Sequence, residues 1–238
     1  MKLIIYLKNI TKIIFGKVAP RVRGSLSLKN VLAKNYPADR PFSFIQVGAW
    51  DGVGYDSLYE FVKAHNTKGV VIEPLPDYFK QLVANYSFNP AIVPVNKAVH
   101  PYLKEIELFR VDPDRTQGLP DWAGGIASID PEHHKKSGIP SAVIIKQRVP
   151  SDHLMNIIKE NFPGKDADLV QIDTEGFDYQ VLQQIDFSYI KPDLVRFEYI
   201  NLDQATTANA IKLLKQNGYY CFYDDLDIIG VNLMKIRL

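Results

Sequence analysis

A glycine-rich turn follows the first strongly apolar run of the chain, and its spacing suits a nucleotide. Gly48, Gly52 and Gly54 come after the run Phe44–Val47 and just ahead of a helical pattern that starts near Tyr55. Glycines at such a junction let backbone amides approach a ligand, and a helix N-terminus adds partial positive charge. The pattern G-x-x-x-G-x-G differs from the G-x-G-x-x-G that cradles a pyrophosphate, and alone it also fits an ordinary tight turn.

An acidic residue stands where a nucleotide-binding sheet needs one. Glu73 ends the apolar run Val70–Ile72. It lies roughly 20 residues past the glycine turn, the distance at which an acid reaches ribose hydroxyls in open α/β sheets. An exposed glutamate at a strand end is the alternative interpretation. Together, the turn and Glu73 predict a site for the nucleoside part of a cofactor.

Further carboxylates end two later strand candidates. Asp173 and Glu175 follow the apolar run Leu169–Ile172, and Glu198 closes the run Leu194–Glu198. Because the carboxyl ends of parallel strands meet at one edge of a sheet, we expect these acids in one polar pocket with the glycine turn. There a carboxylate could bind the charged amino-acid part of a cofactor, orient a hydroxyl or accept its proton.

Alternating strands and helices must position these residues. Short β-branched runs predict strands, and several are apolar on both faces, as central strands covered by helices on each side should be. The predicted strands are Phe42–Val47, Gly69–Ile72, Ile92–Val95, Leu169–Ile172 and Leu194–Glu198. The predicted helices are Tyr55–His65, Asp77–Tyr86, Ser151–Asn161, Tyr179–Ile185 and Gln204–Asn217. We therefore expect an α/β domain with a mostly parallel sheet and helices on both faces.

Two regions depart from this alternation. Tyr219–Tyr223 and Ile228–Lys235 are strand-like runs separated only by a short acidic linker, which predicts a C-terminal antiparallel hairpin. Residues 111–147 contain many Gly and Pro residues that break regular structure. They predict a long irregular loop over the active face.

Composition limits the classes of partner. The chain has 238 residues, with 28 Lys and Arg against 27 Asp and Glu, and a formal net charge of +1. A net charge this small creates no strong electrostatic field around the protein. Outside the first segment there is also no basic stripe with interleaved aromatic residues, so nucleic acid is not an expected partner. Cys221 is the only cysteine, which excludes an internal disulfide and a Cys-rich zinc site. We expect it to be buried in a cytoplasmic protein.

Residues 1–40 are predicted to form a basic amphipathic helical segment ahead of a domain at 41–238. Within Met1–Arg23, lysines and arginines interrupt the apolar residues and no acid occurs. This pattern argues against a transmembrane span, which needs roughly 20 mostly apolar residues, and it fits a secretory signal poorly. We expect the segment to pack on the domain as a lid. Peripheral contact with an anionic membrane surface is the alternative.

Five runs carry a family resemblance, and they are FIQVGAWDGVGYD, VVIEPLPDYF, VNKAVH, DLVQIDTEGFDYQVLQQIDF and PDLVRFEYINL. They resemble the FkbM family of S-adenosylmethionine-dependent methyltransferases, over a region from about Phe42 to Tyr199. The block IDTEGFD is the most specific part. The resemblance implies a Rossmann-like class I methyltransferase fold with a seven-stranded sheet, and the terminal hairpin agrees with it. It also implies methyl transfer to a hydroxyl of a saccharide, glycolipid or polyketide-type small molecule, with a sugar-containing acceptor as the expected partner.

The resemblance further implies which residues contact the cofactor. The methionine and ribose part would lie against Gly48, Ala49 and Gly52, the ribose on Glu73, the adenine beside Asn96 and Ala98, and the reacting end before Asp173. The chain departs from the commonest family pattern at Gln46, where Asp is frequent, and at Trp50, where Asn is frequent. We expect Asp51 to take over part of the polar role at this turn.

Methyl transfer from a sulfonium is an in-line displacement, so a neighbouring group must help to remove the proton of the acceptor hydroxyl. The candidate bases are Asp173, Glu175, Glu198, His133 and His134. The histidine pair lies in the predicted irregular loop. The alternative interpretation is that both histidines are exposed to solvent and take no part in catalysis. A carboxylate pair could hold Mg²⁺, although no ligand spacing demands it. Two rival hypotheses are a dinucleotide-dependent oxidoreductase and a non-catalytic cofactor-binding protein of the same fold.

Overall fold

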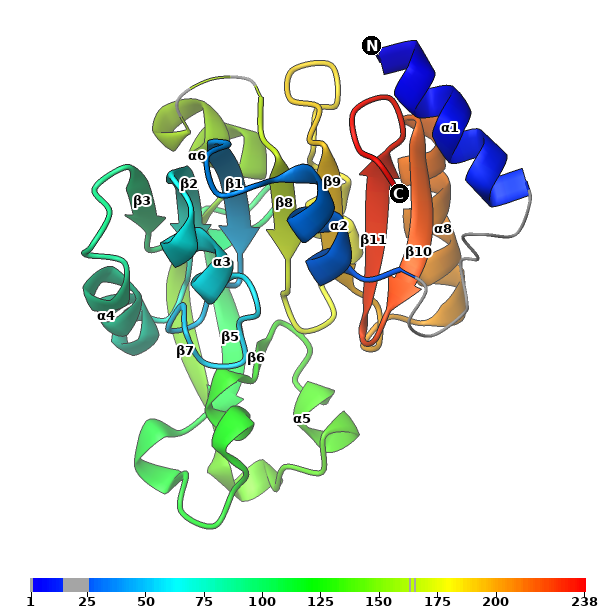
Figure 1. The fold of residues 1–238 in the computed structure, drawn as a ribbon. Coiled ribbons are helices and arrows are strands. Elements are labelled where there is room, and N and C mark those ends of the chain that lie inside the picture. Colours follow the sequence, from blue (N-terminus) through cyan, green and yellow to red (C-terminus); the bar gives the residue numbers. More distant parts are fainter. Residues whose placement is uncertain (1, 15–25, 163, 165) are drawn as a thin grey trace.

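The computed structural model describes residues 2–14, 26–162, 164 and 166–238. Its main sheet has seven strands in the order β10-β11-β9-β8-β1-β2-β3 (Figure 1). The strands are β1 Phe42–Val47, β2 Thr67–Ile72, β3 Ile92–Val95, β8 Leu169–Ile172, β9 Leu194–Glu198, β10 Tyr219–Asp224 and β11 Asp227–Asn232. All neighbouring strands are parallel except for β11, which runs antiparallel between β9 and β10. The predicted mostly parallel sheet with a C-terminal antiparallel hairpin is confirmed.

The central strands of this sheet end level with one another. The last residue of β1 is paired with the last residue of β2 and with the last residue of β8. Gly48, Glu73 and Asp173 directly follow these three strands. The register therefore brings the three residues side by side at the carboxyl edge of the sheet, as the sequence predicts.

Both faces of the main sheet are buried under helices. Along β1, all of whose residues are buried, Phe44 and Ile45 belong to apolar clusters on opposite faces because successive side chains of a strand alternate. The cluster of Ile45 includes residues of α6 Leu154–Asn161, α7 Asp178–Leu182 and α8 Gln204–Gln216. The cluster of Phe44 includes residues of α2 Leu28–Asn35, α3 Tyr59–Ala64 and α4 Pro76–Asn85. The predicted helices on both faces are thus confirmed.

Two helices begin later than the sequence predicts. Helix α3 begins at Tyr59 rather than at Tyr55, because Tyr55 has a φ of 55°, a left-handed conformation that a right-handed helix excludes. The N-terminus of this helix therefore does not follow the glycine turn directly. Helix α6 begins at Leu154 because Ser151 and Asp152 belong to a strand.

A second sheet, which the sequence did not predict, lies beyond the carboxyl ends of β1 and β8 (Figure 1). It has four strands in the order β4-β7-β5-β6, namely β4 Ala98–Val99, β5 Glu105–Val111, β6 Ala127–Ser128 and β7 Ile144–Asp152. Between β5 and β7 the chain forms only β6 and the short helical pieces η1 Pro113–Arg115, η2 Asp121–Gly125, α5 His133–Lys136 and η3 Ser141–Val143. The region predicted to be irregular is therefore shorter than 111–147, since β7 starts at Ile144.

The first helix, α1 Lys2–Ile14, lies against the C-terminal end of the chain (Figure 1). The amide Nδ2 of its buried Asn9 donates to the carbonyl of Leu233 at 3.1 Å and to that of Ile236 at 2.6 Å. The opposite side exposes apolar side chains, including Leu3 and Leu7. Residues 15–25 of the predicted basic segment lie outside the described residues. Membrane contact stays a prediction, and no helix in the described ranges is long and apolar enough to cross a bilayer.

Candidate active site

A cavity of about 980 Å³ opens where the central strands end. Its two ends differ in chemistry. One end is apolar and combines residues after β2 with the second sheet and its loops, namely Leu75, Ile106, Leu108, Ile126, Ala127 and Ile129. The other end is polar and combines residues of β1, β8, β9 and the turns beside them, namely Gln46, Asp56, Gln171, Asp173, Glu175, Arg196, Glu198 and Asn201. A ligand with a flat apolar part and a charged part matches this cavity.

The glycine turn brings two loops into contact at the floor of the cavity. Gly48 has a φ of 76°, and a Cβ at this position would lie 1.7 Å from the carbonyl oxygen of Asp173. No other residue type fits there without moving the backbone. Gly48 and Ala49 line the cavity, as expected. Gly52 turns away from it, because a Cβ there would meet the ring of Tyr86 at 2.5 Å.

Glu73 connects the turn after β1 to the loop after β2. Its Oε2 accepts the backbone N–H of Trp50 at 2.9 Å, and its Oε1 accepts the backbone N–H of Leu75 at 2.8 Å. Burial raises the pKa of Glu73 to about 8, although these two donors and the positive charge of Arg110 oppose the rise. Each carboxylate oxygen keeps a second lone pair, and Glu73 lines the cavity. Two ligand hydroxyls can therefore bind here, as predicted for a ribose.

Asn96 and Asp51 hydrogen-bond to the backbone of loops beside the cavity, but neither residue lines it. Asn96 Nδ2 donates to the carbonyls of Glu73 and Pro74, at 2.8 and 3.0 Å. Asp51 Oδ1 accepts the N–H groups of Val53 and Gly54, at 2.9 and 2.7 Å. Both polar side chains are thus used within the protein. Ala98, also predicted beside the adenine, does line the cavity.

Three of the predicted catalytic acids lie together at the polar end. Asp173 faces the open cavity while protein surrounds its other sides, and this burial, followed by the charges of Glu198 and Glu175, raises its pKa well above the ordinary value. Burial, followed by the charges of Glu175 and Asp178, raises the pKa of Glu198 to about 8. Asn201 Nδ2 donates to Glu198 Oε2 at 2.6 Å and to Glu175 Oε2 at 3.1 Å. Crowded carboxylates of this kind favour a positively charged ligand.

The two candidate histidines are buried, and neither lines the cavity. Nε2 of His133 lies 2.7 Å from Glu175 Oε2, so it carries the proton of that hydrogen bond. Its Nδ1 is buried without a hydrogen-bond partner among the described residues. Nε2 of His134 pairs instead with Ser141 Oγ at 2.8 Å. His133 therefore supports Glu175, and His134 lies outside the site.

No group of three or more His, Cys, Asp or Glu side chains is arranged to hold a metal ion within the ranges that the structure describes.

Comparison with known families decides the identity of the chain. Residues 46–221 match the family model described as the methyltransferase FkbM domain. The chain belongs to the FkbM methyltransferase family. The predicted Rossmann-like class I methyltransferase fold is therefore confirmed.

Several solved methyltransferases have a similar fold. The ribosomal protein L11 methylase of Lactobacillus delbrueckii subsp. bulgaricus is 10% identical over 85% of this chain and 73% of that one, with a TM-score of 0.44. The precorrin-6y C5,15-methyltransferase of Geobacter metallireducens GS-15 is 13% identical over 90% and 92%, with a TM-score of 0.42. The N-terminal domain of human METTL16 in complex with SAH is 11% identical over 94% and 70%, with a TM-score of 0.45. No curated protein matches this chain in sequence.

Sequence reasoning missed two groups of residues in this FkbM methyltransferase. Asp56 lies in the cavity although it falls inside a predicted helix. Arg110 of β5 is buried and forms two hydrogen bonds with Asp77, at 2.6 and 2.7 Å, while its guanidinium lies 5.3 Å from the centre of the Tyr78 ring. That ring in turn packs on Trp50 at 5.5 Å. No local sequence signal marks Arg110, because its partner Asp77 lies 33 residues away in α4.

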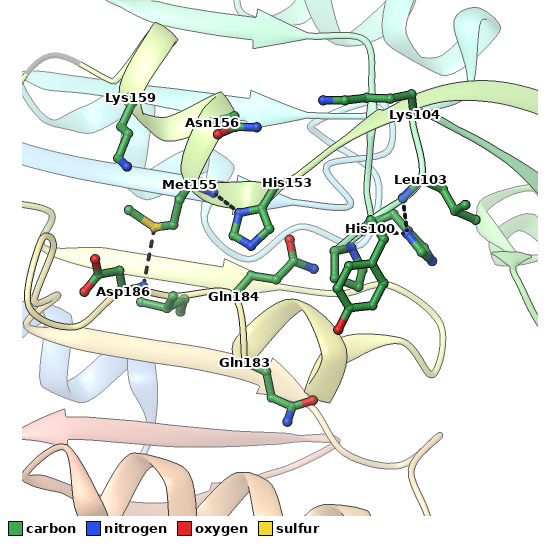
Figure 2. Close-up of a pocket in the computed structure, with 13 residues that line it drawn as sticks. His100, Leu103, Lys104, His153, Met155, Asn156, Lys159, Gln183, Gln184 and Asp186 are labelled. Carbon is green, nitrogen blue, oxygen red and sulfur yellow. Dashed lines mark hydrogen bonds between the residues drawn. The ribbon is translucent and has the colours of Figure 1, made fainter.

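A second cavity, of about 610 Å³, lies beside the start of α6 and contains none of the predicted site residues. Figure 2 shows that polar groups in it bind one another: Met155 N–H donates to His153 Nδ1 at 3.1 Å, and Leu103 N–H donates to His100 Nδ1 at 2.9 Å. Lys104 pairs with Asp152 at 2.7 Å. These polar groups therefore have hydrogen-bond or ion-pair partners within the protein.

Proposed function

We propose that this FkbM methyltransferase uses S-adenosylmethionine to methylate a hydroxyl of a small molecule, with a saccharide as the favoured acceptor. The observation that carries the proposal is the set of Asp173, Glu175 and Glu198 at the polar end of the cavity. Carboxylates attract a positively charged donor, and they also accept the hydrogen bonds and the proton of a hydroxyl.

The residues of the cavity fit the cofactor. The apolar end formed by Leu108 and Ile126 suits an adenine ring, and Glu73 offers two free lone pairs to the ribose hydroxyls. Gly48 leaves room for the chain between the ribose and the polar end. The buried Oε1 of Gln46 and Nε1 of Trp50 lack partners among the residues that the structure describes, so a polar ligand would satisfy them.

When bound, S-adenosylmethionine supplies a methyl group on a positively charged sulfur. Glu198 is the base that we favour, because a carboxylate with a raised pKa of about 8 accepts a proton more readily than an ordinary one. Asn201 holds Glu198 and Glu175 in place through its amide. His133 fixes Glu175 from the protein side and is a positioning residue.

The rim of the cavity favours a sugar over a small aliphatic alcohol. Tyr55, Trp122, Ile200 and Leu226 all line the cavity and have exposed side chains. A sugar presents apolar C–H faces to such side chains and hydroxyl edges to carboxylates and amides. Polyketide-type alcohols share the hydroxyl chemistry but not this pairing of a flat face with a polar edge, whereas the sugar of a glycolipid has both.

Methyl-labelled S-adenosylmethionine tests the proposal with acceptors that offer a glycoside hydroxyl, a simple alcohol, an amine or a carboxylate. We expect label on oxygen of the glycosides, located by NMR of the product. Glu198→Gln should lower kcat by about 100-fold or more while affinity for S-adenosylhomocysteine stays within about twofold. Glu160→Gln, on the exposed side of α6, is the matched control.

Transfer only to nitrogen or to carboxylates would contradict the hydroxyl acceptor. Stabilisation by a nicotinamide dinucleotide without binding of S-adenosylhomocysteine would contradict the cofactor. Full activity of Glu198→Gln would remove Glu198 as the base.

A further inference from the structure

Gln46 is a buried amide whose orientation is fixed by one neighbour. Its side chain is 2% exposed, and its Nε2 donates to Asp56 Oδ2 at 3.0 Å. A carboxylate of this kind accepts hydrogen bonds, so the amide nitrogen must face Asp56 and the oxygen must face away from it. That oxygen, Oε1, is buried without a partner, and Gln46 lines the cavity. A buried acceptor without a hydrogen bond is unfavourable, so a donor is missing here.

Asp56 faces the cavity because the chain turns sharply before it. The left-handed conformation of Tyr55 keeps Asp56 out of α3, and the backbone N–H of Leu58 holds its Oδ1 at 2.8 Å. Burial raises the pKa of Asp56, and the hydrogen bond from Gln46 opposes the rise. The two side chains together present a carboxylate and an amide oxygen, which are acceptors only.

The positive charge of Arg196 opposes the rise in the pKa of Asp56, but the described structure shows no hydrogen bond from Arg196 to Asp56 or Gln46. Arg196 donates from Nη2 to Asp227 at 2.7 Å and from Nη1 to Gln171 Oε1 at 3.2 Å and to Ser57 Oγ at 3.1 Å. Asp56 forms no ion pair with Lys, Arg or His in the part of the chain that the structure describes. The pair thus offers negative charge and free lone pairs to a ligand that is itself a cation with several N–H donors.

We propose that Asp56 and Oε1 of Gln46 bind the ammonium group of the amino-acid part of S-adenosylmethionine. The inference rests on the proposed function. An ammonium group carries three donors and a positive charge, so it satisfies both acceptors at once. Gln46 stands two residues before Gly48 on β1, at the polar end of the cavity and away from the apolar end assigned to the adenine.

This assignment replaces Asp51 with Asp56 as the acid that compensates for a glutamine at position 46. Asp51 Oδ1 is occupied by the N–H groups of Val53 and Gly54, and Asp51 does not line the cavity. Asp56 lies farther along the same loop and touches Gln46 directly. The acid at this place therefore lies on the loop rather than on the strand, and Gln46 donates a hydrogen bond to it.

The test compares S-adenosylhomocysteine with its deamino analogue, in which hydrogen replaces the α-amino group, by calorimetric titration. Wild-type protein should bind the amino compound at least about tenfold more tightly, which corresponds to about 1.4 kcal/mol. Asp56→Asn should reduce this preference to within about twofold and leave the affinity for the deamino analogue nearly unchanged. Asp51→Asn, which alters the same loop, should keep the wild-type preference.

A preference retained by Asp56→Asn, or equal binding of both compounds by the wild type, overturns the inference and leaves the proposed function standing. Absence of S-adenosylhomocysteine binding by the wild type overturns both. If Asp56→Asn binds neither compound, Gln46→Leu decides the matter, because it removes Oε1 and keeps the Asp56 carboxylate. A reduced preference in Gln46→Leu supports the inference, and an unchanged one overturns it.

Discussion

The backbone N–H of Trp50 donates to Oε2 of Glu73 at 2.9 Å, so the acid expected to bind the ribose also fixes the turn that surrounds the cofactor. Trp50 has a φ of 49°, a conformation that few residues other than glycine adopt. Its ring packs on Tyr55 at 5.9 Å and on Tyr78 at 5.5 Å. One hydrogen bond and two ring contacts thus hold Trp50 in this strained conformation, and loss of Glu73 should affect both the turn and the ligand.

Glu73→Ala should weaken S-adenosylhomocysteine binding by about tenfold or more, because both ribose hydroxyls lose their acceptor. It should also lower the free energy of unfolding by about 1–3 kcal/mol, since the N–H groups of Trp50 and Leu75 lose theirs. Calorimetric titration and urea unfolding measure the two effects. Glu60→Ala, on the exposed side of α3, serves as the control. Unchanged binding in Glu73→Ala would remove the ribose assignment.

The central strands could be predicted because they are apolar on both faces. A run such as Phe42–Val47 predicts a strand that is buried on both faces. Acids that directly follow parallel strands of this kind meet at one edge of the sheet. Glu73, Asp173 and Glu198 were therefore predictable as neighbours in the fold from their positions alone.

The second sheet and the role of Asp56 could not be predicted in this way. Strand β7 shows no regular alternation of apolar and polar residues, contains a proline and has many exposed positions, so its sequence resembles a polar loop. Asp56 falls in a run with helical periodicity, and only the left-handed Tyr55 removes it from the helix. His133 and Glu175 are 42 residues apart, and no local pattern predicts a contact over such a distance.

Cofactor binding should release protons near neutral pH. The pKa of Glu73 and that of Glu198 are raised to about 8, so both carboxyls are largely protonated in the free protein at pH 7. Ribose hydroxyls and the positive charge of S-adenosylmethionine favour the ionised forms. Affinity should therefore rise from about pH 6.5 to 8.5, by up to about tenfold per pH unit for each proton released. Titration in two buffers with different ionisation enthalpies counts these protons.

The stability of the free protein should change with pH in the opposite direction. Because the folded pKa of each carboxyl lies above its ordinary value of 4.5, the stabilisation is complete below that value and is lost as the pH rises through about 8. The melting temperature without ligand should fall between about pH 5 and 8 and level off above that, and the ligand should reduce the fall. Glu73→Gln should flatten both profiles, and profiles identical to those of the wild type would contradict the assignment.

His133→Ala should lower kcat by roughly tenfold and leave the affinity for S-adenosylhomocysteine within about twofold. The physical reason is that Glu175 loses the 2.7 Å hydrogen bond that orients it, while no residue assigned to the cofactor changes. His134→Ala removes the neighbouring ring, which binds only Ser141, and should affect the melting temperature but not kcat. A larger loss of kcat in His134→Ala than in His133→Ala would reverse these roles.

Asp77→Ala should destabilise the protein, because it leaves the guanidinium of Arg110 without its carboxylate. Arg110 is 2% exposed and retains only Gln147 and the carbonyl of Val111 as hydrogen-bond acceptors. Removing one partner of a buried ion pair costs about 3–5 kcal/mol, and the partial exposure of Asp77 places the expected loss nearer 2 kcal/mol. Urea unfolding measures it, with Asp114→Ala on an exposed turn as the control.

The same substitution should also weaken the cofactor site, although Asp77 does not line the cavity. Arg110 lies over the Tyr78 ring, and Tyr78 packs on Trp50, so disorder at Arg110 reaches the turn that Glu73 holds. Binding of S-adenosylhomocysteine by Asp77→Ala should fall by several fold under conditions in which the variant is folded. Wild-type affinity in the folded variant would show that the pair of Asp77 and Arg110 stabilises the protein without shaping the site.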